Sequence, residues 1–174
     1  DFNTITFLSN EKAAWSADML NYVASLGPFP HFNTVALTSH VRQMDESCEA
    51  AFANLLAQCP NLVSLEIMSV AEFKGEFLAS LNPSIIRVLD LAGTSLEEEH
   101  LEAYVDAIVD EKKIENPLLN TLLLPKTIGA ECLVRVLDKL AKREVYLDHL
   151  RCCCVSDELL PAISQHSKNL EFLS

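Results

Sequence analysis

The amino-acid sequence predicts an α/β solenoid, in which a parallel sheet lines the inner side and a row of helices covers the outer side. A short apolar pattern, L-x-x-L-x-L with any apolar residue allowed, recurs along nearly all of the 174 residues. The segments that follow it carry apolar residues at helical spacing. One strand and one helix cannot bury their apolar faces alone, whereas stacked units share a core. We therefore expect residues 1–174 to form one repeating domain.

The strands are predicted at the recurring apolar pattern. Its first positions fall near residues 2, 32, 62, 86, 119, 147 and 170, at intervals of 23 to 33 residues with a mean of 28. The six full copies are Phe2/Ile5/Phe7, Phe32/Val35/Leu37, Leu62/Leu65/Ile67, Ile86/Leu89/Leu91, Leu119/Leu122/Leu124 and Leu147/Leu150/Cys152, and Leu170/Leu173 is a truncated seventh. We expect six to seven repeats. Because both chain ends fall at strands, we expect either a fragment of a longer array or end strands that something else covers.

Helices are predicted between the strands, where apolar residues recur every three or four positions. The three clearest stripes are Cys48, Ala51, Phe52, Leu55 and Leu56; Leu101, Tyr104, Val105, Ile108 and Val109; and Cys132, Leu133, Val136, Leu137 and Leu140. Ser95 and Glu98 match a capping box at the start of the second stripe. Pro60, Pro83 and Pro117 lie where a helix has ended and the next strand is about to begin.

The composition excludes two classes of partner. Thirteen Lys and Arg stand against 25 Asp and Glu, a net charge of −12, and the cations are scattered. Binding to a phosphate backbone requires a cationic face, so we expect no nucleic acid. The longest stretch without a charged residue, Met19 to Val41, contains Gly27, Pro28 and Pro30 and is not a membrane span.

Motifs for enzyme chemistry do not occur in the sequence. A phosphate-binding loop needs clustered glycines, because backbone N–H groups must approach the anion. The four glycines are isolated, at Gly27, Gly75, Gly93 and Gly129. The G-x-S-x-G and H-E-x-x-H patterns do not occur either. We therefore expect no enzyme activity and no cofactor.

Three consecutive cysteines, Cys152, Cys153 and Cys154, form the most unusual local feature. Neighbouring residues of a strand point to opposite faces, so this run makes a poor disulfide framework, and it lacks the C-x-x-C spacing of zinc sites. We expect free thiols, no metal and an intracellular location, cytoplasmic or nuclear. Cys152 is expected in the core strand and Cys154 in the following turn, and the remaining cysteines, Cys48, Cys59 and Cys132, are expected to be packing residues.

Two segments resemble the cysteine-containing leucine-rich repeats of F-box substrate receptors: residues 50–67, AAFANLLAQCPNLVSLEI, and residues 154–174, CVSDELLPAISQHSKNLEFLS. Cys59-Pro60-Asn61-Leu62 matches the strand entry of those repeats, and residues 167–170 match it without the Cys and Pro. Residues 89–108, LDLAGTSLEEEHLEAYVDAI, are closer to ribonuclease-inhibitor-like repeats. The resemblance implies a leucine-rich-repeat horseshoe that recognises proteins through its concave sheet, as in ubiquitin-ligase substrate selection. No segment has an F-box pattern, so the ligase role rests on analogy.

The residues between the leucines of each strand are predicted to point away from the core and form a binding face. Three columns cross this face: Thr4, Thr34, Ser64, Val88, Thr121 and His149; then Thr6, Ala36, Glu66, Asp90, Leu123 and Arg151; then Leu8, Thr38, Met68, Ala92, Pro125 and Cys153. Exposed apolar residues in such a face usually mark a contact surface, and Met and Arg are common interface anchors. The predicted protein-binding residues are Glu66, Met68, Asp90, Leu123, His149 and Arg151.

Residues 97–115 hold eight acidic and two basic side chains, a net charge of −6. No EF-hand pattern is present, and the apolar stripe accounts for the alternate positions. The run is therefore predicted to be a solvated outer face, with docking of a basic partner as the alternative.

Three functions remain open at this stage. The first is a non-catalytic protein-binding module, either a substrate receptor or an assembly adaptor. The second is a regulator of another enzyme, which activates a GTPase or inhibits a nuclease through Arg87, Arg151 or the 97–115 run. The third is an enzyme that uses Cys153 or Cys154 as nucleophile, for which the thiol pKa would have to be depressed.

Overall fold

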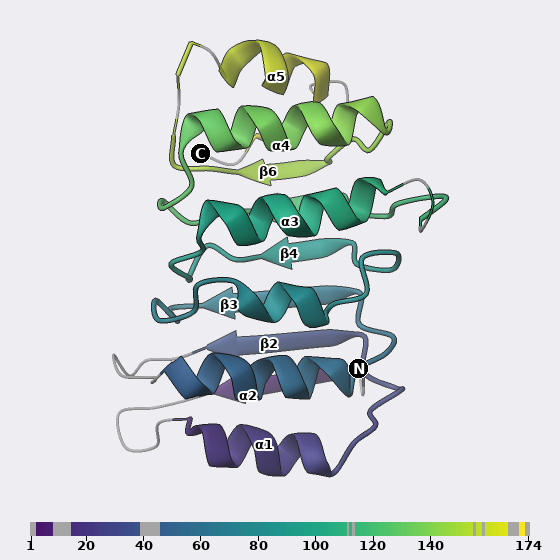
Figure 1. The fold of residues 1–174 in the computed structure, drawn as a ribbon, viewed down its shortest axis with the longest axis vertical. Helices are drawn as coiled ribbons and strands as arrows, with labels where there is room; N and C mark the ends of the chain where they lie inside the picture. The colour runs from purple at the N-terminus through teal and green to yellow at the C-terminus, as the bar shows by residue number, and fades with distance from the viewer. Residues whose placement is uncertain are drawn as a thin grey trace.

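Within the part of the chain that the computed structural model describes, seven strands form one parallel sheet in chain order. The strands are β1 (Thr4–Leu8), β2 (Thr34–Thr38), β3 (Ser64–Met68), β4 (Val88–Asp90), β5 (Thr121–Leu123), β6 (His149–Arg151) and β7 (Glu171–Phe172). The structure describes residues 3–8, 15–38, 46–110, 112, 114–154, 156–157, 159–166 and 171–172. The predicted α/β class with a single open parallel sheet is confirmed (Figure 1).

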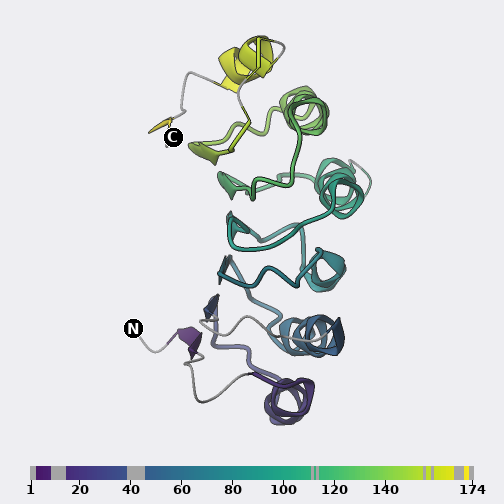
Figure 2. The ribbon, with the colours of Figure 1, turned by 90° about the vertical axis from the view of Figure 1, so that its left-hand side faces the viewer.

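The helices all lie on one side of the sheet (Figure 2). They are α1 (Ala17–Ser25), α2 (Glu46–Ala57), the 3-10 helix η1 (Glu76–Ser80), α3 (Glu98–Val109), α4 (Ala130–Lys142) and α5 (Leu159–His166). The strands follow the inner side of a shallow arc and the helices follow its outer side. We call the sheet surface that faces away from the helices the concave face. No helix among the described residues is long and apolar enough to cross a membrane.

The core lies between the two layers, and the predicted strand positions fill it. Val35, Leu65, Leu89, Leu122 and Leu150 are fully buried and stand opposite one another in register on β2 to β6. Burial alternates along each strand because neighbouring side chains point to opposite faces. The predicted positions Phe2, Leu170 and Leu173 lie outside the described residues.

Backbone hydrogen bonds at the strand entries repeat along the array. The Asn33 carbonyl accepts from the N–H groups of Val63 and Ser64, at 2.8 and 2.9 Å. The carbonyls of the equivalent residues, Asn3, Val63, Arg87 and Asn120, each accept in the same way from two successive N–H groups of the next strand entry. Each repeat therefore stacks on the next with the same offset.

The three predicted apolar stripes form the inward faces of α2, α3 and α4. All their residues are buried except Val109, which is partly buried against the core. The longest of these helices, α4, has 13 residues. The outer layer is thus held to the sheet by the pattern that the sequence indicates.

The predicted capping box of Ser95 and Glu98 is wrong. Helix α3 has Glu97 at its N-cap, and the Glu97 side chain makes no capping hydrogen bond. Ser95 lies two residues before the N-cap, and its N–H donates to the Phe73 carbonyl at 3.0 Å. The Glu98 carboxylate instead accepts from the Gly129 N–H at 2.9 Å, at the N-cap of α4.

The third repeat differs from its neighbours because it is short. Only 24 residues separate its first position from that of the next repeat, and the five-residue η1 takes the place of an α-helix. Three phenylalanine rings, Phe52, Phe73 and Phe77, pack with centroids 5.4 to 5.8 Å apart beneath it. Gly75 at the N-cap of η1 has φ of 113°, which favours glycine.

Candidate functional site

The concave face carries two columns of side chains in the predicted register. The strand pairings align Thr4, Thr34, Ser64, Val88, Thr121 and His149, and beside them Thr6, Ala36, Glu66, Asp90, Leu123 and Arg151. Adjacent strands lie about 4.8 Å apart, so neighbours in a column can contact the same partner group. Both predicted columns are confirmed.

The middle of the concave face is acidic. Glu66 on β3 stands opposite Asp90 on β4, and both are partly buried. The Ser64 hydroxyl donates to Glu66 Oε1 at 3.4 Å, and Asp90 Oδ1 accepts from the Ala92 N–H at 3.1 Å. Asp90 is therefore oriented by its own turn, whereas the longer contact constrains Glu66 less.

The end of the face near β6 is apolar and basic. Leu123 on β5 stands opposite Arg151 on β6, and Thr121 stands opposite His149. Arg151 is exposed, whereas Leu123 and His149 are half-buried. The register therefore places an aliphatic residue and an arginine on neighbouring strands at this end.

The third predicted column, at the ends of the strands, is only partly correct. Leu8 and Met68 are exposed, at 67% and 44%, on β1 and β3. Pro125 was predicted to face outward, but it is buried. It lies two residues beyond the end of β5, and its carbonyl accepts from the Ile128 N–H at 3.3 Å. The alternation of faces ends with the strand, because the chain has already turned toward the helix layer.

Most of the cysteines are buried or half-buried, where their thiols pack against other side chains. Cys48, Cys59 and Cys132 are buried, as predicted. Burial raises the pKa of Cys59 to about 11, of Cys132 to about 12 and of the half-buried Cys152 to about 11. A raised pKa disfavours the thiolate, which is the reactive form. In the predicted nucleophile pair, Cys153 is exposed and Cys154 is half-buried.

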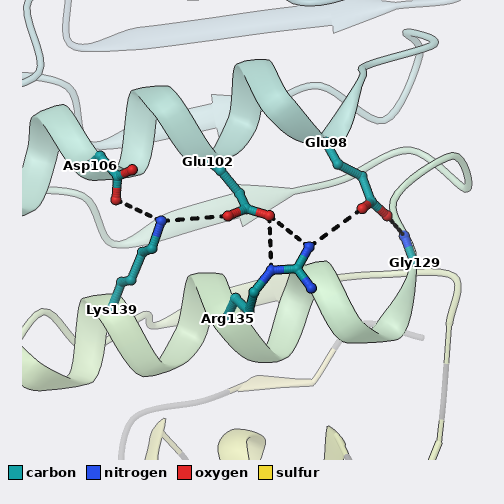
Figure 3. A network of polar contacts seen from close by, with 6 residues as sticks. All are labelled: Glu98, Glu102, Asp106, Gly129, Arg135 and Lys139. Atoms are coloured by element: carbon teal, nitrogen blue, oxygen red, sulfur yellow. Dashed lines mark hydrogen bonds and ion pairs between the residues drawn. The ribbon is translucent and has the colours of Figure 1, made fainter.

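The acidic run forms an ion network between α3 and α4 (Figure 3). Arg135 Nη2 lies 2.7 Å from Glu102 Oε1 and 3.6 Å from Glu98 Oε2. Lys139 Nζ lies 2.6 Å from Asp106 Oδ1 and 3.5 Å from Glu102 Oε2. The hydrogen bond from Arg135 holds the pKa of Glu102 below its ordinary value.

This network corrects the prediction that the acidic run is a merely solvated face. Glu98, Glu102 and Asp106 have cationic partners on the next helix, because α3 and α4 lie side by side. Glu115 and Lys112 are exposed, and Glu111 and Lys113 lie outside the described residues. A basic partner would therefore have to compete with Arg135 and Lys139 for the three paired acids.

A buried carboxylate that the sequence analysis did not single out supports the short third repeat. Glu49 on α2 is 5% exposed and accepts from the Lys74 and Gly75 N–H groups at 2.8 and 2.7 Å. Gly75 is the N-cap of η1, so the carboxylate stabilises the start of that helix. Glu98 does the same for α4 through Gly129. The sequence shows no signal for either contact, because the partners are 26 and 31 residues apart.

A cavity of about 310 Å³ lies between η1 and α3. It is lined by Gly75, Glu76, Leu78, Ala79, Leu81, Pro83, His100, Ala103, Tyr104 and Ala107. Tyr104 is 5% exposed, and its hydroxyl has no hydrogen-bond partner in the described part of the chain. Burial raises the pKa of that hydroxyl. The signal in the sequence for this cavity is the short interval between the third and fourth repeats.

Comparison with protein-family models, with curated proteins and with solved structures found no match. The function is therefore inferred from the geometry of the chain itself. Two surfaces stand out in that geometry: the concave face with its mixed chemistry, and the cavity beside η1.

Proposed function

We propose that this chain is a non-catalytic protein-binding module of the leucine-rich-repeat type, with six to seven repeats in a horseshoe, and that a protein partner binds its concave face. The observation that carries the proposal is the register of the sheet. It aligns acidic, apolar and basic side chains on four adjacent strands, β3 to β6, on the surface that the helices leave open.

The chemistry of this face suits protein recognition. Interface anchors are enriched in Arg, aromatic residues and Met, surrounded by polar residues that exclude water. Met68 and Arg151 are exposed on the face, and Leu123 adds an aliphatic surface beside Arg151. Glu66 and Asp90 would give the partner a fixed orientation, because charge complementarity contributes chiefly to specificity and association rate.

Catalysis by the cysteine run is the weaker alternative. A nucleophilic thiol needs a depressed pKa and neighbouring positive charge. Burial instead raises the pKa of Cys152 to about 11, and Cys152 donates to the Cys154 carbonyl at 3.5 Å. These contacts support a structural role for the start of the cysteine run.

Regulation of another enzyme is the nearer alternative, since one of its candidate residues, Arg151, lies on the same face. It would engage an exposed arginine, and both Arg87 and Arg151 are exposed. The role as substrate receptor or adaptor is distinguished from it by the captured partner. An adaptor of a ubiquitin ligase would support the first role, and a GTPase or a nuclease would support the second.

The experiment is affinity capture from cell extract followed by mass spectrometry, with wild type and two variants of equal charge change. The first variant, Glu66→Lys with Asp90→Asn, alters the concave face and keeps an oxygen that can accept from the Ala92 N–H. The second, Glu131→Lys with Asp18→Asn, alters exposed acids on the helices.

We expect the specific partner to be captured by wild type and by the helix variant but not by the concave variant. Thermal unfolding of all three proteins separates loss of binding from loss of fold. Equal capture by the two variants would contradict the proposal.

A further inference from the structure

The cavity beside η1 exists because one repeat is too short to complete the outer layer. Helices α2 and α3 have 12 residues each, whereas η1 between them has five. Within the described part of the chain the backbones of α2 and α3 do not approach each other closely, whereas each lies close to η1. Space therefore remains on the outer surface along the flank of α3 that faces η1.

The cavity has apolar walls. Leu78, Leu81 and Pro83 line it from η1 and the loop that follows, and Ala103 and Ala107 line it from α3. The alanines lie four residues apart on one face of the helix and project little volume. At about 310 Å³ the cavity is at the lower end of the range for ligand pockets. An aliphatic side chain would be buried in it with a gain in free energy from the apolar area removed from water.

The rim of the cavity is acidic. Glu76 lines the cavity and is exposed. His100 also lines it, and one ring nitrogen of His100 lies within 4.8 Å of a carboxylate oxygen of Glu97 and of Glu99. Lys74 Nζ lies 3.7 Å from Glu97 Oε1 and offsets that charge. Negative charge therefore lies at the rim of an apolar cavity.

Two of these carboxylates are available to a partner. Among the described residues, neither Glu76 nor Glu99 forms an ion pair. Two cations of α4, Arg135 and Lys139, are engaged on the opposite flank of α3 by Glu98, Glu102 and Asp106. In the described part of the chain, Glu76 and Glu99 have no such partner helix beside them.

We infer that this cavity binds a segment of a partner protein that inserts one aliphatic side chain and places a Lys or Arg next to it. The apolar walls take the aliphatic group, and Glu76 and Glu99 pair with the cation. This surface is separate from the concave face, since it lies on the helix side of the array. A partner that bound the concave face and reached round to this cavity would gain affinity from both.

The test is an NMR titration of the ¹⁵N-labelled chain with three blocked heptapeptides. They are Gly-Ser-Arg-Leu-Arg-Ser-Gly, the same peptide with Gly in place of Leu, and the same peptide with Glu in place of both Arg. We expect the first to shift the amides of Gly75, Ala103 and Ala107 with a Kd of about 1 mM or below. Each of the other two should bind about fivefold more weakly or worse.

Two variants and a control locate the binding site. Ala103→Phe should fill the cavity and weaken the first peptide about tenfold or more, whereas Ala57→Phe, at an exposed alanine of α2 outside the cavity, should leave its affinity unchanged. Glu76→Gln with Glu99→Gln should weaken it about threefold or more at low salt. Four outcomes would each overturn the inference. They are an affinity unchanged by Ala103→Phe, chemical shift changes confined to the concave strands, equal affinity for the three peptides, and no shift at 5 mM peptide.

Discussion

The two flanks of α3 are closed in different ways. On the side of α4, Arg135 and Lys139 bind acids spaced one turn apart along α3, and two full-length helices lie side by side. On the side of η1 the neighbouring helix is short, and a cavity with apolar walls and an acidic rim remains. The flanks belong to the same helix, so the difference comes from the length of the neighbouring repeat.

The strand pairing of the inner layer is unaffected by this difference in repeat length. The Val63 and Arg87 carbonyls each accept two N–H groups on either side of the short repeat, as at the other junctions. Ser64 stands opposite Val88 just as Val88 stands opposite Thr121. Variation in repeat length is therefore absorbed by the outer layer, and the columns of the concave face stay aligned.

The largest effect is expected in the core beneath both flanks. Leu89 on β4 is fully buried, so Leu89→Ala should lower the free energy of unfolding by about 2 to 5 kcal/mol through lost burial and a cavity. Val88→Ala, at the adjacent outward position, is the control and should cost about 1 kcal/mol or less. Urea denaturation measures both. A larger loss for Val88→Ala would place the strand one residue out of register.

The next effect compares the starts of the two helices on either side of α3, η1 and α4. Glu49→Ala should lower the free energy of unfolding by about 2 to 3 kcal/mol, because two N–H groups at a buried helix start lose a charged acceptor. Glu98→Ala removes the matching contact to Gly129 on the flank facing α4, where the side chain is partly exposed, and should cost about 1 kcal/mol or less. Equal losses of unfolding free energy, measured by thermal or urea unfolding, would show that η1 and α4 depend equally on these carboxylate contacts.

The smallest effect is expected from the ion network. Because the pKa of Glu102 is lowered from 4.5 in the folded chain, its contribution to stability is present above pH 4.5 and is lost as the pH falls through the lowered value. Glu102→Gln should therefore lower the melting temperature slightly at pH 7 and low salt, and less in 1 M salt. Glu76→Gln on the other flank is the control and should show no such salt dependence. A salt-independent loss in Glu102→Gln would mean that packing, not charge, holds α4 to α3.

Much of the inner layer could be predicted from the sequence, because it depends on local alternation repeated several times. Apolar residues such as Leu65 and Leu89 occur at the same place in each repeat, so the register of one strand predicts the register of the others. The same reasoning failed at Pro125, where the strand had ended and alternation no longer applied.

The outer layer was less predictable because its contacts connect residues far apart in the chain. Glu98 was assigned to a local capping box with Ser95, but its acceptor role is toward Gly129 in the next repeat. The pairing of Arg135 with Glu102 depends on how two helices align, which their separate sequences do not specify. The cavity results from a helix that is shorter than its neighbours. The sign of it in the sequence is the short spacing between the third and fourth repeats.

The most direct test of the central claim is the affinity of the captured partner for a concave double variant. Leu123→Ala with Arg151→Ala removes the apolar and basic pair that the register places side by side. The control, Leu160→Ala with Lys142→Ala, removes an exposed leucine and an exposed cation from the helices. Isothermal titration calorimetry should show a loss of about thirtyfold or more for the concave variant, on the order of 2 kcal/mol, and an unchanged Kd for the control. An unchanged Kd for the concave variant, with its fold intact by circular dichroism, would contradict the assignment of binding to this face.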